Sequence, residues 1–108
     1  MTDIFPYLER VRRRFTDPKL RDYFEGFNRT LLFEFTDLRT TYVITSNGNA
    51  EATLEEKRIS HPDIVVTTST QTLAGIMDRK VNPVTAYAMR KIKAKGAMED
   101  LLKLQKLL

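Results

Sequence analysis

Few side chains in this sequence are of the types that carry out catalysis. The chain has one histidine, His61, and no cysteine, which excludes a thiolate nucleophile, a disulfide and a cysteine-ligated metal site. Ser60 precedes His61, but a serine nucleophile and its base come from separate parts of a chain and need a third group that orients the base. We therefore interpret His61, in a turn before Pro62, as a surface residue.

The acidic residues and the glycines do not indicate a reaction centre either. Glu55-Glu56 and Glu99-Asp100 are adjacent pairs, and neighbouring side chains on a strand or a helix point in different directions. The 4 glycines lie too far apart in the sequence to form a phosphate-binding loop. A metal site needs several histidines, cysteines or clustered carboxylates. The sequence predicts no catalytic residue, no metal and no cofactor, and hence a protein that is not an enzyme.

The chemistry that the sequence does offer lies in a basic C-terminal third. The formal net charge is +4, and from Arg79 to Leu108 there are eight Lys or Arg residues against two acidic ones. Lys91, Lys93 and Lys95 alternate with apolar residues, which predicts a strand with one basic and one apolar face. This basic excess suits the attraction of anionic lipid, a carboxylate ligand or nucleic acid, or it simply keeps the surface solvated.

The chain length and composition are those of one globular domain. The 108 residues are 42% hydrophobic and 30% charged. We expect a single domain over residues 1–108, with an N-terminal helix over 1–15 and a core over 16–108. The sequence opens Met1-Thr2-Asp3 without an apolar secretory segment, and it has no apolar stretch long enough to span a bilayer, so we expect a cytoplasmic protein.

Hydrophobic periodicity and turn residues predict the order of the elements after the first helix. They are a short helix opened by Asp17-Pro18, strands over 29–36, 40–46 and 50–55, a strand over 63–68, a helix that begins at Thr68, a short helix opened by Asn82-Pro83, a strand over 91–95 and a helix over 97–108.

The dipeptide Asn47-Gly48 predicts a hairpin with a two-residue loop, because both residues tolerate the positive φ of a type I′ turn. In that register Val43 faces Ala52, and Thr41 faces Leu54. The resulting surface is apolar but thinly filled. A packed helix or a bound ligand must therefore occupy the space above it.

The predicted last helix carries an unusually heavy apolar load for a chain end. Five of the last eight residues are leucine, and Leu101, Leu104 and Leu108 fall on a broad apolar side. Chain ends normally fray into water. This helix must therefore dock, and three partners satisfy the pattern: the domain's own core, a bound apolar molecule, or another protein chain.

The order of the segments in the C-terminal half is similar to that of a known family. The segments are the strand Asp63-Ile64-Val65-Val66-Thr67-Thr68-Ser69, the helix around Leu73-Ala74-Gly75-Ile76-Met77, the helix start Asn82-Pro83-Val84-Thr85-Ala86, the strand Lys91-Ile92-Lys93-Ala94-Lys95-Gly96 and the leucine-rich end. Together with the preceding strands, this order resembles the sterol carrier protein type-2 domain family over residues 16–108. Two positions depart from the family pattern: Ala97 replaces an acidic residue after the strand glycine, and Arg79-Lys80 replaces a Gly-Lys pair.

The resemblance implies an α+β fold. Its parts would be a mostly antiparallel five-stranded sheet, helices packed over one face, and an apolar tunnel between them. It also implies non-catalytic binding and carrying of a lipid such as a fatty acid, an acyl-CoA or a sterol. The candidate lipid-binding residues are Val43, Ala52, Leu54, Leu73, Ile76, Met77, Val84, Tyr87, Met89, Leu101, Leu104 and Leu108. Lys91, Lys93 and Lys95 are the candidates for contact with a headgroup or an anionic membrane.

Three alternatives stay open at this point. The same apolar residues also suit a solid core without a ligand. The leucine-rich helix suits a protein-interaction module that forms a homodimer. The basic strand suits a weak nucleic-acid binder, although base stacking needs exposed aromatic residues and only Tyr87 lies near that strand; we expect no specific nucleic-acid partner.

Overall fold

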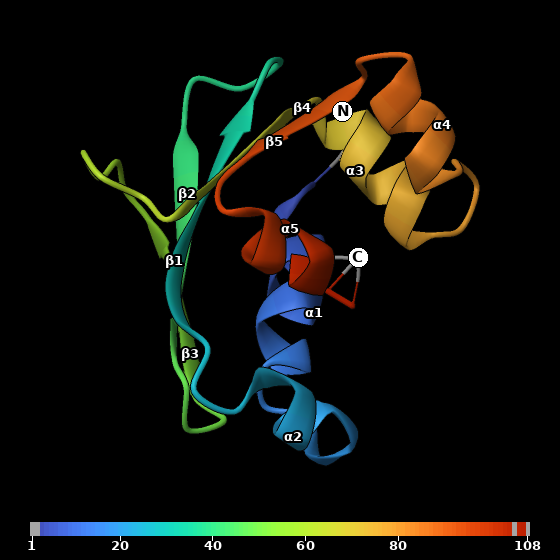
Figure 1. Cartoon of the computed structure of the whole chain (residues 1–108). Helices are drawn as coiled ribbons and strands as arrows, with labels where there is room; N and C mark the ends of the chain where they lie inside the picture. Colours follow the sequence, from blue (N-terminus) through green and yellow to red (C-terminus); the bar gives the residue numbers. More distant parts are fainter. Residues whose placement is uncertain (1–2, 105, 108) are drawn as a thin grey trace.

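The computed structural model describes residues 3–104 and 106–107, which form a five-stranded sheet with helices on one side (Figure 1). In chain order the elements are α1 (Phe5–Arg14), the 3-10 helix η1 (Pro18–Leu20), α2 (Arg21–Phe24), β1 (Asn28–Phe35), β2 (Thr41–Asn47), β3 (Ala52–Glu56), β4 (Ile64–Thr68), α3 (Thr70–Met77), α4 (Pro83–Ala88), β5 (Ile92–Lys95) and α5 (Met98–Leu104). The predicted α+β class is confirmed.

The strand order in the sheet is β3-β2-β1-β4-β5. The pairs β1–β2, β2–β3 and β4–β5 are antiparallel, and β1–β4 is parallel, so the sheet is mixed and mostly antiparallel, as predicted. The parallel pair arises because the chain leaves the edge strand β3 and returns beside β1, on the far side of β2. This crossing joins the two halves of the sheet into one layer.

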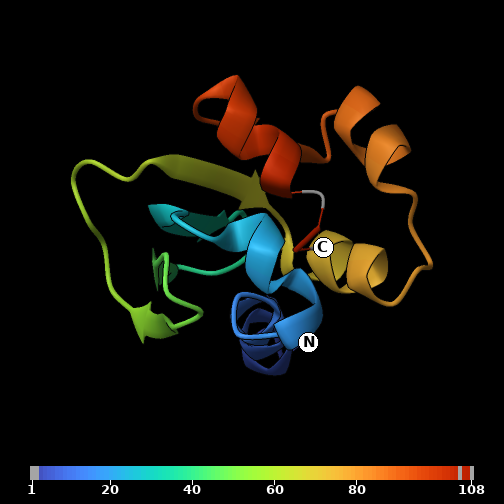
Figure 2. The same cartoon turned by 60° about the horizontal axis from the view of Figure 1, so that its bottom comes forward.

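The connection over residues 57–63 runs across the sheet face that lies opposite the helices (Figures 1 and 2). Its first residue donates its backbone N–H to the carbonyl of Thr41 at 3.1 Å. At its other end, Asp63 Oδ2 accepts the N–H of Thr30 at 2.8 Å, and the Asp63 N–H donates to Thr30 Oγ1 at 3.0 Å. All the helices are therefore left on the other face, as predicted (Figure 1).

Polar side chains start three of the helices. Asp17 and Asn82 each accept backbone N–H groups from the first turn that follows, and each is followed by proline, as the sequence predicted. The start of α3 differs by one residue from the prediction: Ser69, not Thr68, is the N-cap, and its Oγ accepts the N–H of Thr72 at 3.0 Å. Thr68 remains the last residue of β4.

The β2–β3 hairpin has a longer loop than the sequence predicted. Its last strand pair before the loop is Ser46 with Ala52, so five residues, Asn47–Glu51, separate the paired positions. Asn47 Oδ1 accepts the N–H of Asn49 at 2.8 Å, and Gly48 has a φ of 79°. Hydrogen bonds that the asparagine side-chain oxygen accepts from the loop backbone favour this wider turn over a two-residue turn.

The predicted cross-strand pairs Val43/Ala52 and Thr41/Leu54 are therefore wrong. Leu54 pairs with Ile44, whereas Val43 pairs with Glu55. The observed register differs from the predicted one by three residues. Successive side chains of a strand point to opposite faces, so a shift by an odd number of residues places each predicted pair on opposite faces of the sheet. Val43 thus lies on the opposite face of the sheet from Ala52 and Leu54.

Candidate functional site

The sheet face beneath the helices is apolar across its width. In the middle of the sheet, Leu31 of β1 lies beside Ile44 of β2 on one side and Ile64 of β4 on the other, and all three are buried. The same face continues with Phe33, Phe35, Leu54, Val66 and Ile92. A continuous apolar floor of this kind needs an apolar cover.

The helices provide that cover with side chains that are nearly inaccessible to solvent. Leu73, Ile76 and Met77 of α3, all predicted from the sequence, are buried in one cluster with the sheet residues. Leu8 and Val11 of α1 belong to the same cluster. The apolar interior therefore lies where the buried side chains of α1 and α3 pack against the apolar face of the sheet.

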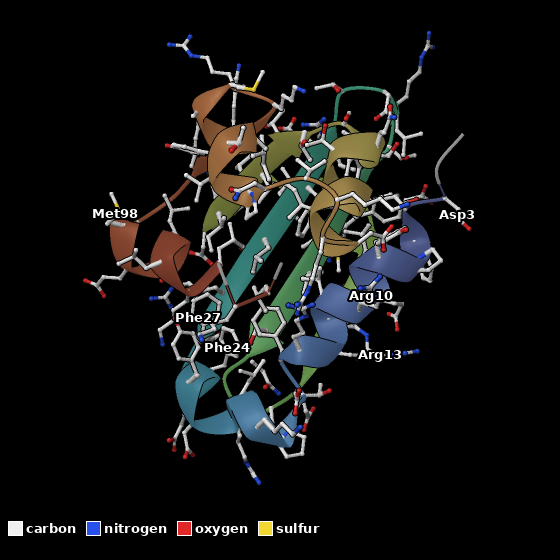
Figure 3. The ribbon with its side chains drawn as sticks, turned by 90° about the vertical axis from the view of Figure 1, so that its right-hand side faces the viewer. Asp3, Arg10, Arg13, Phe24, Phe27 and Met98 are labelled. Atoms are coloured by element: carbon white, nitrogen blue, oxygen red, sulfur yellow. The ribbon has the colours of Figure 1, made fainter. Side chains whose placement is uncertain are left out.

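Three phenylalanines that the candidate set omitted form one end of this interior. The ring centroids of Phe15 and Phe24 are 5.1 Å apart, and those of Phe15 and Phe27 are 5.9 Å apart. Figure 3 shows Phe24 and Phe27 at the end of the molecule near α2 and α5. The signal available in the sequence was the concentration of aromatic residues on both sides of Gly26.

The C-terminal segment packs against the apolar interior from the helix side of the sheet. Leu104 and Leu107 are buried in the same cluster, with exposed fractions of 6% and 0%, and Leu101 is half-buried against it. Leu108 lies outside the described residues. Seen from the helix side, α5 lies beside the other helices with Met98 pointing outward (Figure 3). Docking of the last helix on the chain's own core is thus what the structure describes.

Polar contacts attach α5 to the rest of the chain. The Nε of Arg29 donates to Asp100 Oδ2 at 3.0 Å, and Lys103 Nζ donates to the carbonyl of Tyr23 at 2.9 Å. Lys103 Nζ also lies 5.6 Å from the centroid of the Phe27 ring. The hydrogen bond to Asp100 raises the pKa of Arg29, which therefore stays charged.

The predicted residues of the hairpin divide between the two faces. Ala52 and Leu54 are half-buried and pack against the core cluster from the edge strand β3. Val43 is also buried, but on the face that the connection over residues 57–63 crosses. The structure thus brings Ala52 and Leu54 to the interior, and it does not bring Val43 there.

The predicted residues of α4 lie outside the interior. Val84, Tyr87 and Met89 are 75%, 63% and 60% exposed. Of the residues in α4, Ala86 is the buried one. This six-residue helix at the corner of the molecule presents one side chain inward, whereas the resemblance had implied that Val84, Tyr87 and Met89 bind lipid.

The three candidate lysines are exposed on or next to the edge strand β5. Ile92 is buried and Ala94 half-buried, so the predicted alternation of a basic and an apolar face is confirmed. A hollow of about 460 Å³ lies between α4 and β5. It is lined by Tyr87, Ala88, Arg90, Ile92, Lys93, Ala94 and Lys95.

A second hollow, of about 310 Å³, lies where α1 faces the hairpin. It is lined by Arg12, Thr16, Thr45, Asn47, Glu51, Ala52 and Thr53. Both hollows open to solvent, and neither is a tunnel enclosed between sheet and helices. The tunnel that the resemblance implied stays a prediction.

The described residues contain no cluster of three or more histidine, cysteine, aspartate or glutamate side chains that could hold a metal ion. His61 is exposed in the connection between β3 and β4. Within residues 3–104 and 106–107, no helix has the length and hydropathy needed to cross a membrane.

Two of the shifted pKa values arise from hydrogen bonds between residues of different segments of the chain. The hydroxyl and the N–H of Thr70 lower the pKa of Asp37. A hydrogen bond to Asp78 raises the pKa of Tyr7. Asp37 lies in the turn after β1, whereas Tyr7 packs against the core cluster from α1.

Comparison with solved structures places this geometry in a known fold. The sterol carrier protein domain 2 of Helicoverpa armigera shares 21% sequence identity at a TM-score of 0.78, over 96% of this chain and 84% of that one. Palmitated SCP2L2 from Aedes aegypti shares 16% identity at a TM-score of 0.67, over 95% and 91% of the two chains. At these identities the likeness shows the fold.

A third similar structure is the stereoselective inverting sec-alkylsulfatase Pisa1 from Pseudomonas sp., with 26% identity and a TM-score of 0.66. The match covers 81% of this chain but 13% of the sulfatase. No curated protein matches the chain.

The sequence model of the SCP-2 sterol transfer family matches residues 8–108. That range contains all five strands and α2 to α5, together with most of α1. The family model covers well over half of the chain, and the chain belongs to the SCP-2 sterol transfer family.

Proposed function

We propose that this chain binds and carries a lipid with a long apolar chain, without catalysing a reaction on it. The proposed site is the interior between the sheet and the helices, lined by Leu54 of β3, by Leu73, Ile76 and Met77 of α3, and by the C-terminal leucines. Family membership supports the ligand class. The description of one structural neighbour as palmitated supports a fatty-acyl ligand in particular.

The observation that carries the proposal is the position of Leu104 and Leu107. Both come from the last turns of the chain, yet both are buried in the main core cluster. Helix α5 has seven residues and pairs with no strand, so its displacement would leave the sheet intact. An acyl chain that replaced these two leucines would leave the interior apolar and filled.

The energy available to such a ligand is adequate for a carrier. Each methylene removed from water contributes about 0.8 kcal/mol, so a dozen contribute about 10 kcal/mol. Loss of translational freedom and displacement of α5 oppose binding by several kcal/mol. With an opposing cost of about 4 kcal/mol, the net is about −6 kcal/mol, a dissociation constant on the order of tens of micromolar, which permits release as well as uptake.

The proposed headgroup contacts are Lys91, Lys93 and Lys95. They are exposed beside the hollow between α4 and β5, and Lys93 and Lys95 line it. Val84, Tyr87 and Met89 would meet a lipid only outside the interior, and Val43 lies on the other face of the sheet. We therefore leave these four residues out of the proposed interior site.

The test is native mass spectrometry of the purified protein, with lipid extraction of the same sample, followed by titration with a fluorescent long-chain fatty acid. We expect co-purified lipid and saturable binding of one fatty acid per chain. Leu107→Ala should strengthen binding about threefold or more, because a cavity opens where the acyl chain would lie. Leu102→Ala is the matched control, since Leu102 is exposed and the change should leave affinity unaltered.

Two results would oppose the proposal. If the purified protein carries no lipid and shows no saturable binding of fatty acid, acyl-CoA or sterol, the proposed lipid-binding function is wrong. If Leu102→Ala and Leu107→Ala change the affinity for the fatty acid equally, the ligand does not bind at the proposed interior site. The homodimer through the leucine-rich helix remains the alternative, and size measurement of the same sample tests it.

A further inference from the structure

Helix α4 is poorly covered by the rest of the protein. Val84 and Tyr87 are three positions apart and therefore share one side of the helix, and Met89 follows at its C-terminal end. All three are mostly exposed. Single exposed apolar residues are common, but three within six positions of the chain form a patch that needs an explanation.

The strand beside this helix supplies positive charge without any acidic residue. From Arg79 to Met98 the sequence contains no aspartate or glutamate. Within the part of the chain that the structure describes, Arg90, Lys91, Lys93 and Lys95 form no ion pair. Arg10, Arg12, Arg13, Arg29 and Arg58 lie within 3.9 Å of a carboxylate oxygen, whereas Arg21, Arg39 and Arg79, among the described residues, also form no ion pair.

Arg90 occupies a backbone position that favours glycine. Its φ is 60°, and it ends α4 in a Schellman motif: the Arg90 N–H donates to the Tyr87 carbonyl at 3.0 Å, and the Lys91 N–H donates to the Ala86 carbonyl at 2.8 Å. A side chain with a Cβ is strained in this left-handed conformation. The guanidinium therefore stands at a strained position without an intramolecular partner among the described residues.

The hollow between α4 and β5 is lined by both apolar and positively charged residues. Tyr87, Ala88, Ile92 and Ala94 give it an apolar lining, and Arg90, Lys93 and Lys95 place cations around it. In Figures 1 and 3 α4 lies at the end of the molecule away from α2. A flat surface can therefore approach this end without meeting α1 or α2.

We propose that the surface formed by Val84, Tyr87, Met89, Arg90, Lys91, Lys93 and Lys95, the α4–β5 surface, docks on bilayers that contain anionic lipid. The apolar side chains of α4 enter the headgroup region, and the cations contact lipid phosphates. Apolar residues beside unpaired cations are the combination that an anionic bilayer interface binds. A polynucleotide would use the cations and one aromatic ring, and it would leave Val84 and Met89 without a role.

The first experiment measures binding to vesicles of phosphatidylcholine, with and without a minor fraction of phosphatidylglycerol. We expect binding to the anionic vesicles that falls with salt concentration. The combined change Lys91→Gln, Lys93→Gln and Lys95→Gln should weaken binding by about tenfold or more. The control, Lys19→Gln, Arg21→Gln and Arg39→Gln, removes the same net charge from exposed positions elsewhere and should change binding by less than about twofold.

The second experiment locates the surface directly, because the chain contains no tryptophan. Val84→Trp should show a blue-shifted emission on addition of anionic vesicles, whereas Phe5→Trp, at an exposed position on α1, should not. The proposal is overturned if the two charge variants lose binding equally, if the shift appears at position 5 and not at position 84, or if a polynucleotide binds while vesicles do not. These measurements do not depend on lipid carriage, so either proposal can fail alone.

Discussion

Asp100 of α5 and Arg29 of β1 form the ion pair that joins the C-terminal helix to the central strand, with 3.0 Å between Nε and Oδ2. The Asp100 side chain is 10% exposed, whereas that of Arg29 is 39% exposed. The arginine also lies 5.8 Å from the centroid of Phe27. The pair therefore fixes α5 at the aromatic end of the interior.

Asp100→Asn should lower the free energy of unfolding by about 1 kcal/mol, because it removes the charge and keeps the shape of the side chain. Urea unfolding measures the change. Glu99→Gln is the control on the neighbouring exposed residue and should alter stability by less than about 0.5 kcal/mol. Equal effects of the two variants would show that the Arg29 contact contributes nothing.

Leu104→Ala should destabilise the protein by about 2–4 kcal/mol, since Leu104 is buried in the core cluster and its removal leaves a cavity. Met98→Ala, on the exposed side of the same helix, should cost less than about 0.5 kcal/mol. Thermal unfolding of both variants checks this. A small effect at Leu104 would mean that α5 does not dock in solution as described.

Gly26 and Gly48 form a matched pair for separating backbone strain from steric contact. Both have positive φ, 75° and 79°. A Cβ at Gly48 would lie 3.1 Å from the Gly26 backbone, but one at Gly26 would meet nothing within 4 Å. We expect Gly26→Ala to cost about 1 kcal/mol and Gly48→Ala about 2 kcal/mol or more in urea unfolding. Equal costs would contradict the close approach of the two loops.

Arg79→Gly should stabilise the protein by about 0.5–1 kcal/mol. Arg79 has a φ of 60° and ends α3 in a Schellman motif, where its N–H donates to the carbonyl of Ile76 at 3.1 Å. Lys80→Gly is the control at the next, unstrained position, and it should not stabilise. A lower melting temperature for Arg79→Gly would show that the arginine side chain makes a contact worth more than the strain.

The pKa of Asp37 should lie below its ordinary value, because the carboxylate accepts hydrogen bonds from the hydroxyl and the N–H of Thr70. A lowered folded-state pKa means that the contribution to stability is present above the unfolded pKa. It is lost as pH falls through the folded pKa. NMR titration should show the Asp37 pKa rising in Thr70→Val, whereas Thr67→Val, on the outer face of β4, should leave it unchanged.

The sequence was sufficient for much of the fold, because the relevant signals are local. Proline after Asp17 and Asn82 marks helix starts, since proline fixes φ and those side chains accept the first N–H groups. The alternation around Ile92 marks a strand with one buried face, since the period of side chains along a strand is two. The family resemblance rested on the order of such segments, and the family model confirms it.

Other features depended on distances that no local pattern encodes. The hairpin register was set by the contacts of Asn47 within a five-residue loop, and it moved Val43 to the other face. Helix α4 has an apolar pattern like that of a buried helix, but its place beside the edge strand leaves Val84 and Tyr87 exposed.

The sequence alone therefore determined which residues are apolar, where elements begin and which family the chain resembles. The tertiary structure decided which apolar residues face the interior, because burial depends on how whole layers pack rather than on the periodicity of any one element. It also decided the pairing of Arg29 with Asp100, which lie 71 positions apart and meet because β1 passes beneath the last helix.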